Sequence, residues 1–251
     1  MLMHKVLGTT GKPWLIFFNS LGCDWSMWDA QVAVLEKDRQ ILLVNKPGHG
    51  DAPVGEPINS IQGFADALIA TMDSLGIEKA EYCGLSIGGR VGTVLGSDYA
   101  PRFRRLILVC GGTGDPTKAS VWAQRIAVAR DNGMAGIAEG SVSRWFDDAF
   151  IEQAPGDVAK IKGMVAACDP EGYAHACEAL RDQDTLEQTR NISVPTMVVA
   201  GGNDQSTPVA ALRAMSDMIN GALYIEIDAG HIVNVERPAE FNRALVGFLG
   251  P

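Results

Sequence analysis

One short segment, Gly84-Leu85-Ser86-Ile87-Gly88-Gly89, limits most strongly what this chain can fold into. It follows the apolar run Ala80–Cys83, so it predicts a tight turn from a strand into a helix that begins at Ile87. A residue on so sharp a turn tolerates only minimal side chains two positions before and after it, and glycine stands at both. The pattern G-x-S-x-G in this setting predicts that Ser86 is a nucleophile.

A glycine-rich turn between a strand and a helix can also bind the phosphates of a dinucleotide. That fingerprint, G-x-G-x-x-G, requires glycine where Ser86 stands, so the segment does not match it. The nucleophile turn also places the backbone N–H of Ile87 where it can stabilise an oxyanion, with the helix dipole behind it. We therefore expect a serine nucleophile and one donor of its oxyanion hole in this segment.

The rest of the chain alternates short apolar runs with longer helical patterns. This alternation is typical of an α/β fold, a mostly parallel sheet with helices on both faces. One amphipathic helix is expected near Ile61–Leu75, and the last helix, near Pro238–Phe248, opens with a proline suited to a first turn. The predicted strands are Trp14–Phe18, Gln40–Val44, Ala80–Cys83, Arg105–Cys110, Thr196–Ala200 and Leu223–Ile227.

The alternation stops between about residues 111 and 190. That stretch indicates several alanine-rich helices and no convincing strand, and it is too long to be a loop. We therefore expect a single α/β domain over residues 1–251, with a helical cap inserted at about residues 111–190.

A serine hydroxyl is a weak nucleophile until a base takes its proton. The predicted base is His231, which follows the last strand and precedes the last helix, in the chain order serine, acid, histidine. The alternative for His231 is a histidine on a surface loop. The other three histidines are His4 near the start of the chain, His49 on a turn and His175 within the predicted cap.

The acid that orients the histidine is expected at the end of another strand. Asp204 is the preferred candidate, because it follows the apolar run Thr196–Ala200. Asp115 is the rival, since it follows the preceding strand through a run of glycines, whereas Asp228 is too close to His231 in sequence to face its ring easily. Either Asp204 or Asp115 could instead be a turn residue that bonds its own backbone.

The second donor of the oxyanion hole should come from the loop after the strand Trp14–Phe18. This loop reads Asn19-Ser20-Leu21-Gly22. We assign the backbone N–H of Leu21 to the role on position alone.

Composition excludes several classes of function. A net charge of −9 argues against a nucleic-acid surface and means that an anionic substrate needs local positive charge. The five cysteines are widely spaced and form no C-x-x-C pair, so neither a disulfide framework nor a metal site is indicated. The apolar runs are too short to span a bilayer, and no export signal is visible. We expect a cytoplasmic protein without membrane contact, metal or cofactor.

At this point the sequence resembles a known family, the 3-oxoadipate enol-lactonases within the α/β-hydrolases. The matches run over nearly the whole chain, and the matching segments within the predicted cap are more specific to the family than the serine turn. They are Asn19-Ser20-Leu21-Gly22, Ser26-Met27-Trp28-Asp29, Cys83–Gly89, Arg144-Trp145-Phe146, Glu171-Gly172-Tyr173, Arg181-Asp182, Thr207-Pro208 and His231–Pro238.

The resemblance implies hydrolysis of an enol-lactone that carries a free carboxylate, in the breakdown of aromatic compounds. It also implies a triad of Ser86, Asp204 and His231, and it places Arg144 and Trp145 in the pocket above the nucleophile. From the residues alone, Arg144 would be a solvated charge and Trp145 a core residue of the cap. A guanidinium near the nucleophile suits an anionic substrate in a net-negative protein.

The chain departs from the family pattern at two places. The family usually has an aspartate and an arginine before its Gly-His-Gly, whereas here Asn45-Lys46-Pro47 precedes Gly48-His49-Gly50. The first departure alters a loop that can border the entrance of the active site, and the sequence does not predict its effect. The stretch before Trp14 is also short and leaves room for at most one small strand.

The sequence thus predicts a serine hydrolase that forms an acyl-enzyme with a small anionic lactone or ester. A general carboxylesterase or a cofactor-free haloperoxidase (perhydrolase) would use the same triad with a different pocket. A non-catalytic binding protein on the same fold usually lacks a triad member, and here all three residue types are present. The sequence makes no prediction of oligomeric state.

Overall fold

Seven strands form one sheet in the order β1-β3-β2-β4-β5-β6-β7. The computed structural model describes residues 1–250. Only β1 runs antiparallel to its neighbour, and the other pairs are parallel, so the predicted α/β fold is confirmed. The strands are β1 (Met3–Gly8), β2 (Trp14–Phe18), β3 (Gln40–Asn45), β4 (Ala80–Leu85), β5 (Phe103–Val109), β6 (Thr196–Gly201) and β7 (Leu223–Ile227).

All the predicted strands are present, with small shifts at their ends. Strand β4 continues to Leu85, since its last residues are buried and pair with β5 up to Val109. Strand β5 begins earlier than predicted, at Phe103, which is buried and pairs with β4. It ends before Cys110, whose φ of 48° turns the chain out of the extended conformation. The one small strand allowed before Trp14 is β1, at the edge of the sheet.

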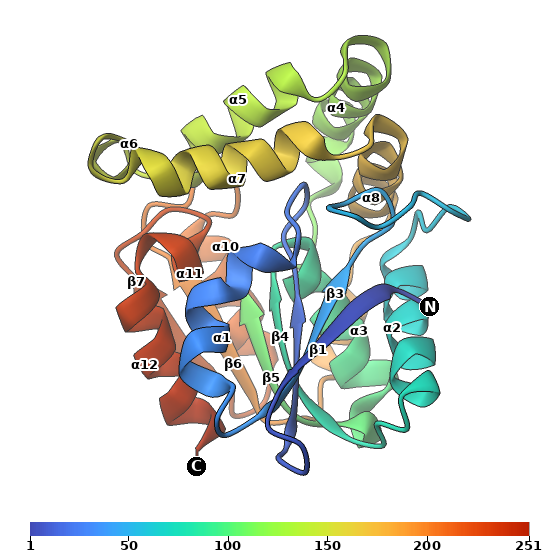
Figure 1. Ribbon diagram of the computed structural model, residues 1–251, viewed down its shortest axis with the longest axis vertical. Coiled ribbons are helices and arrows are strands. Elements are labelled where there is room, and N and C mark those ends of the chain that lie inside the picture. Colours follow the sequence, from blue (N-terminus) through green and yellow to red (C-terminus); the bar gives the residue numbers. More distant parts are fainter. Residues whose placement is uncertain (251) are drawn as a thin grey trace.

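Helices cover both faces of the sheet (Figure 1). Helices α1 (Asp29–Leu35) and α12 (Pro238–Leu249) pack together on one face, whereas α2 (Ile61–Ser74) and α3 (Ile87–Asp98) pack together on the other. Helix α10 (Val209–Met218) packs on β6 and β7, and the short α11 (Val233–Glu236) precedes α12. Within residues 1–250, no helix combines the length and the apolar character that crossing a membrane requires.

Consecutive aromatic residues of β2 show how the sheet joins its two helical layers. The ring of Phe17 stacks on Trp28 at 4.7 Å between centroids, and Trp28 lies 6.3 Å from Phe241 of α12. The next residue, Phe18, points to the other face and meets the edge of Phe64 of α2 at 6.2 Å. Burial of each such side chain stabilises the fold by about 1.5–3 kcal/mol, so β2 anchors both layers.

The chain between β5 and β6 forms helices only, in the stretch where the sequence predicts an insertion. We call this set, α4 to α9, the inserted helices. Helices α4 to α8 lie beyond the carboxyl ends of the parallel strands, at the top of the view in Figure 1, whereas α9 packs against α3. Their bounds are α4 (Ala119–Asn132), α5 (Ala135–Trp145), α6 (Asp148–Gln153), α7 (Pro155–Ala167), α8 (Pro170–Asp182) and α9 (Leu186–Arg190), with a 3₁₀ turn η3 (Pro116–Lys118) before them.

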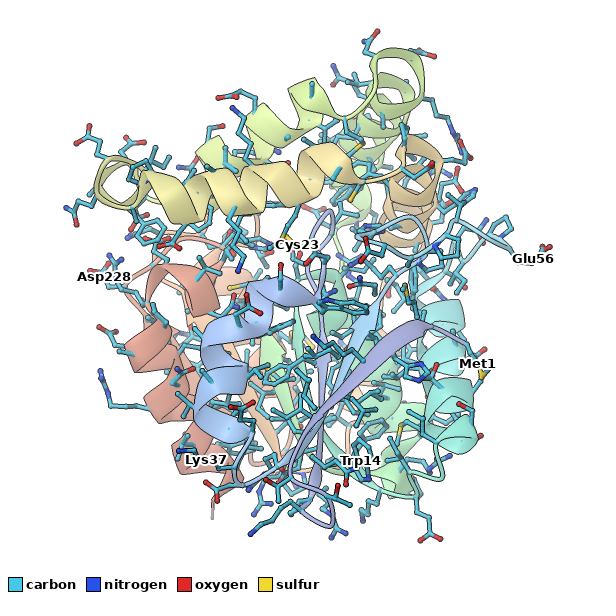
Figure 2. All side chains as sticks on the ribbon, in the orientation of Figure 1. Met1, Trp14, Cys23, Lys37, Glu56 and Asp228 are labelled. Carbon is cyan, nitrogen blue, oxygen red and sulfur yellow. The ribbon has the colours of Figure 1, made fainter. Side chains whose placement is uncertain are left out.

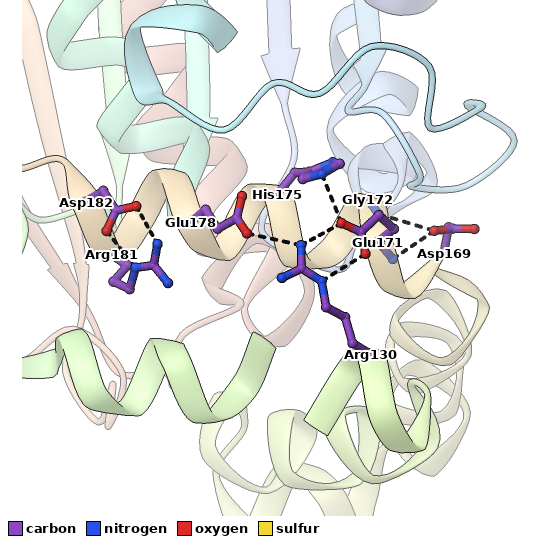
Figure 3. A network of polar contacts seen from close by, with 8 residues as sticks. All are labelled: Arg130, Asp169, Glu171, Gly172, His175, Glu178, Arg181 and Asp182. Atoms are coloured by element: carbon purple, nitrogen blue, oxygen red, sulfur yellow. Dashed lines mark hydrogen bonds and ion pairs between the residues drawn. The ribbon is translucent and has the colours of Figure 1, made fainter. Parts of the chain in front are cut away.

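A network of charged side chains joins α4 to α8 (Figure 3). Arg130 of α4 pairs with Glu171 and Glu178 of α8, and His175 lies 3.1 Å from the same Glu171. Exposed ion pairs contribute only about 0–1 kcal/mol each. The network therefore adds little to the stability of this helix pair.

Candidate active site

The turn after β4 has the sharp geometry that its glycines predict. Ser86 lies between β4 and α3 with φ 59° and ψ −114°, a conformation that costs energy for a residue with a side chain. A Cβ atom on Gly84 would lie 2.3 Å from the carbonyl oxygen of Gly88, and one on Gly88 would lie 2.5 Å from that of Phe18. Only glycine fits at both positions, so the packing around the turn holds Ser86 in place.

His231 and Asp204 form a buried pair. The Nδ1 atom of His231 lies 2.6 Å from Oδ2 of Asp204, and both side chains are almost fully buried. The other oxygen, Oδ1, accepts the backbone N–H groups of Ser206 at 2.7 Å and Thr207 at 3.0 Å. Burial by itself would raise the pKa of Asp204, but the His231 ring and these hydrogen bonds outweigh it and lower that pKa. The carboxylate is therefore charged and its two oxygens have separate partners.

The loop that carries His231 is fixed by contacts from two directions. The carbonyl oxygen of Trp145, at the end of α5, accepts the N–H groups of His231 at 2.7 Å and Ile232 at 3.3 Å. The Trp145 ring lies 5.9 Å from the His231 ring. From the other side, Glu236 accepts the N–H of Gly230 at 3.0 Å, and burial is the main cause that raises the pKa of Glu236 to about 7. The loop of His231 is thus held by the inserted helices on one side and by α11 on the other.

The rival acids do not bond to His231. Asp115 is exposed and accepts the N–H of Thr117 at 3.0 Å, as a turn residue does. Asp228 is exposed at the surface, where it accepts from Asn203 at 3.0 Å (Figure 2). Neither is a hydrogen-bond partner of His231 in the described part of the chain.

A pocket of about 440 Å³ opens between the sheet and the inserted helices. Its lining brings together five of the seven residues that the sequence singled out, namely Leu21, Ser86, Arg144, Trp145 and His231. The other two do not line it. Asp204 lies behind His231, and the side chain of Ile87 is fully buried, although its N–H belongs to the first turn of α3, where helical N–H groups lack partners within the helix.

His231 is the one histidine that lines this pocket among residues 1–250. His4 lies in β1 with Nδ1 3.1 Å from the carbonyl oxygen of Leu2. His49 is buried with Nδ1 2.9 Å from the carbonyl oxygen of Pro47, and His175 belongs to the network of Figure 3. The geometry therefore offers a single imidazole to Ser86.

The pocket is cationic although the protein carries a net charge of −9. Its lining contains a single acidic side chain, Asp115, and four basic ones, Arg90, Lys118, Arg125 and Arg144. None of these four forms an ion pair with a carboxylate in the described residues. A cleft lined by charge of one sign attracts ligands of the opposite sign, so this pocket favours an anion.

Arg125 and Arg144 stand together in the lining. Arg125 donates to the hydroxyl of Tyr173 at 3.0 Å and to Ser141 at 3.1 Å, and its guanidinium lies 5.7 Å from the ring of Trp122. Arg144 is half-buried; burial first, and then the charge of Arg125, lower the pKa of Arg144. Two guanidinium groups that repel each other inside a pocket gain most from a shared anion.

Sequence reasoning did not single out Lys118, Trp122 or Arg125. Trp122 and Arg125 are three positions apart on α4, so they share a helix face, and this spacing was the available signal. Their inward direction follows from the packing of α4 against α8, which the sequence does not reveal.

The altered loop Asn45-Lys46-Pro47 contributes no residue to the lining of the pocket. Asn45 and Lys46 are buried, and the following Gly48 packs against Gly172 of α8. The altered loop instead contacts the Asn19–Gly22 loop, through Asn45 to Asn19 and through Lys46 to Ser20.

One group of side chains in residues 1–250 could hold a metal ion. Cys110, Asp204 and His231 each offer a ligand atom, all within 4.8 Å of one another. Two of these atoms already join in the His231–Asp204 hydrogen bond. Burial, and then the charge of Asp204, raise the pKa of the Cys110 thiol well above its usual value, so the protonated thiol is favoured over a thiolate ligand.

Comparison with known proteins shows which family this chain is similar to. The sequence profile of the alpha/beta hydrolase family matches residues 15–244. The chain is 35% identical to 3-oxoadipate enol-lactonase 2 of Acinetobacter baylyi, over 97% of this chain and 91% of that protein. It superposes on the crystal structure of the enol-lactonase from Burkholderia xenovorans with a TM-score of 0.95 at 35% identity, covering 99% of this chain and 96% of that one. A thermophilic esterase from Thermogutta terrifontis, solved with malate bound, gives a TM-score of 0.92 at 27% identity, covering 99% and 92%.

Proposed function

This chain belongs to the alpha/beta hydrolase family, and we propose that it hydrolyses an enol-lactone that bears a carboxylate, with Ser86, His231 and Asp204 as its triad. The observation that carries the proposal is the joint placement of Ser86, His231 and unpaired guanidinium groups in one pocket. The likeness to enol-lactonases over nearly the full length supports the same substrate class.

The proposed reaction is acyl transfer through the serine. His231 takes the proton of Ser86 as its oxygen attacks the lactone carbonyl, and Asp204 stabilises the imidazolium that forms. The N–H groups of Leu21 and Ile87 hold the oxyanion. Cleavage of the ring C–O bond releases the enol oxygen, which takes the proton from His231. A water molecule, deprotonated by His231, then cleaves the acyl-enzyme and regenerates Ser86.

The substrate carboxylate would bind between Arg125 and Arg144. Both line the pocket with Ser86, and no carboxylate of the described chain neutralises either one. Arg125 is braced by Tyr173 and Ser141, which favours a fixed direction for its guanidinium. The inserted helices, which supply both arginines, would then act as the cap that selects the substrate.

Replacing Arg144 with glutamine should lower kcat/KM for the carboxylate-bearing lactone about 10- to 100-fold, the usual contribution of a hydrogen bond to a charged group. Hydrolysis of an uncharged aryl ester should change little, because that substrate has no anion to bind. Initial rates on both substrates test this, with Arg243→Gln on the exposed face of α12 as the matched control. Equal losses on the two substrates would contradict a carboxylate site.

The proposed function itself is tested by comparing kcat/KM for 3-oxoadipate enol-lactone and for an uncharged aryl ester, with Ser86→Ala as the blank. We expect the lactone to be preferred by orders of magnitude. The likeness to the Thermogutta terrifontis esterase favours a general carboxylesterase as the second candidate. A preference for the aryl ester would select that candidate and overturn the lactone assignment.

A further inference from the structure

Lys46 is a buried cation without a carboxylate partner. It follows β3 and its side chain is 1% exposed, and in residues 1–250 no ion pair includes it. Burial of an unpaired ammonium is costly, so such a group is expected to have compensating dipoles and often a role. Its partners are backbone carbonyl oxygens, those of Ser20 at 2.8 Å, Asn19 at 3.4 Å and Cys23 at 3.5 Å.

The nearest of these carbonyls belongs to the peptide group that carries a proposed oxyanion donor. The C=O of Ser20 and the N–H of Leu21 are parts of one trans peptide plane, so they point in opposite directions. An ammonium on the Ser20 oxygen therefore fixes the Leu21 N–H on the side away from Lys46. Leu21 lines the pocket together with Ser86.

We propose that Lys46 is a positioning residue for the oxyanion hole, holding the Ser20–Leu21 peptide so that its N–H faces the oxygen that develops charge above Ser86. This inference rests on the proposed function, which assigns the Leu21 N–H to that oxygen. The Lys46 ammonium, which donates to the Ser20 carbonyl oxygen, also polarises this peptide group and so strengthens the Leu21 N–H as a donor.

The remainder of the loop has its own anchors. Asn19 donates to the carbonyl oxygen of Val44 at 2.8 Å and to the side chain of Asn45 at 2.9 Å, and it accepts from Trp28 at 3.0 Å. The Ser20 carbonyl itself also accepts the backbone N–H of Cys23 at 3.2 Å. Loss of the ammonium therefore leaves the loop attached and removes the shorter of the two hydrogen bonds that hold the Ser20–Leu21 peptide. A catalytic defect without loss of the fold follows from this arrangement.

Lys46 is also the group near this loop that changes charge in a mildly alkaline range. Burial is the main cause that lowers its pKa to about 8, and the nearby Asp24 opposes this effect. Burial raises the pKa values of the Cys23 and Cys168 thiols, that of Cys168 to about 12, so they remain neutral there. Burial, and then the charge of Lys46, lower the pKa of His49, which is neutral as well. As the pH rises through about 8, the charged form of Lys46 is lost, and turnover should fall with it.

Two variants test the proposal, assayed on an uncharged aryl ester from pH 6 to 10 so that the identity of the lactone does not matter. Lys46→Met should lower kcat about 10- to 100-fold with little change in KM, because part of one oxyanion donor is lost. Lys46→Arg should keep most of kcat and lose the decline above pH 8, since arginine does not titrate in this range. Lys37→Met, on the exposed surface, is the matched control and should behave as the native chain.

An unchanged kcat in Lys46→Met, or a Lys46→Arg enzyme that keeps the native decline above pH 8, would overturn the proposal. The native chain supplies an independent test if a variant does not fold, as judged by its melting temperature. Its rate of reaction with an uncharged fluorophosphonate, which also builds charge on an oxygen at Ser86, should fall as the pH rises through about 8, and a flat profile there would overturn the proposal. If Ser86→Ala retains activity, the proposed function fails; if only the Lys46 results fail, the triad stands without this positioning role.

Discussion

Replacing Ser86 with alanine is expected to lower kcat on every ester or lactone substrate on the order of 10⁶-fold, the size of the loss when a triad serine is removed. Alanine keeps the Cβ atom, so it adds no contact to the tight turn between β4 and α3. It also leaves the surrounding glycine packing unchanged. The melting temperature should therefore stay within a few degrees of the native value, which separates a chemical defect from an unfolded protein.

Initial rates with an aryl ester and labelling with a fluorophosphonate probe measure this effect. Ser74→Ala, an exposed serine at the end of α2, is the matched control and should retain both activity and labelling. Turnover that survives in Ser86→Ala would remove the serine mechanism altogether. A native chain that fails to react with the probe would instead favour a binding protein on the same fold.

Replacing Asp204 with asparagine is expected to lower kcat about 10⁴-fold, because the histidine would hold its proton on the wrong nitrogen. The direction follows from the partners of the two carboxylate oxygens. Oδ1 accepts the N–H groups of Ser206 and Thr207, so the oxygen of an asparagine must take that place. Its NH₂ group then faces Nδ1 of His231, which must become an acceptor. The proton moves to Nε2, where the base needs a free lone pair.

The pH dependence of kcat and the melting temperature of Asp204→Asn measure this outcome. Asp228→Asn is the matched control, because Asp228 is exposed and close in sequence to His231 without contacting it. A near-native kcat in Asp204→Asn would contradict the assignment. If Asp115→Asn produced the large loss instead, the rival acid of the sequence analysis would be correct.

The sequence was informative where the signal is local. Glycines around Ser86 predict the turn because the clash they avoid lies within a few residues, between Gly84 and Gly88. Short continuous apolar runs predict the strands, because neighbouring residues of a strand point to opposite faces of the sheet and both faces are covered by helices. Phe17 and Phe18 show this, since each packs on a different face. Some strands end later than the sequence predicts, because pairing with a neighbouring strand continues beyond the apolar run. Strand β4, for example, continues to Leu85, which pairs with Val109 of β5.

Sequence was uninformative where a role depends on contacts between distant segments. Arg125 faces the pocket because Tyr173 and Ser141, on other helices, hold it there. Lys46 looked like a loop residue, yet it is buried because the Asn19–Gly22 loop folds over it. A charged side chain carries no local mark that distinguishes a solvated position from a buried one with backbone partners, so these two residues needed the three-dimensional structure.

The hydrogen bonds from His231 and Ile232 to the carbonyl oxygen of Trp145 constrain how this enzyme can be re-engineered. Because α5 ends on that carbonyl, exchanging the inserted helices as one block for those of a relative would also exchange the support of the imidazole. A graft that stops before Trp145, and so replaces α4 and most of α5 while keeping the native junction, would alter substrate choice without loosening the base. The boundary between the replaceable and the indispensable part of the insertion therefore lies inside a helix and not at a loop.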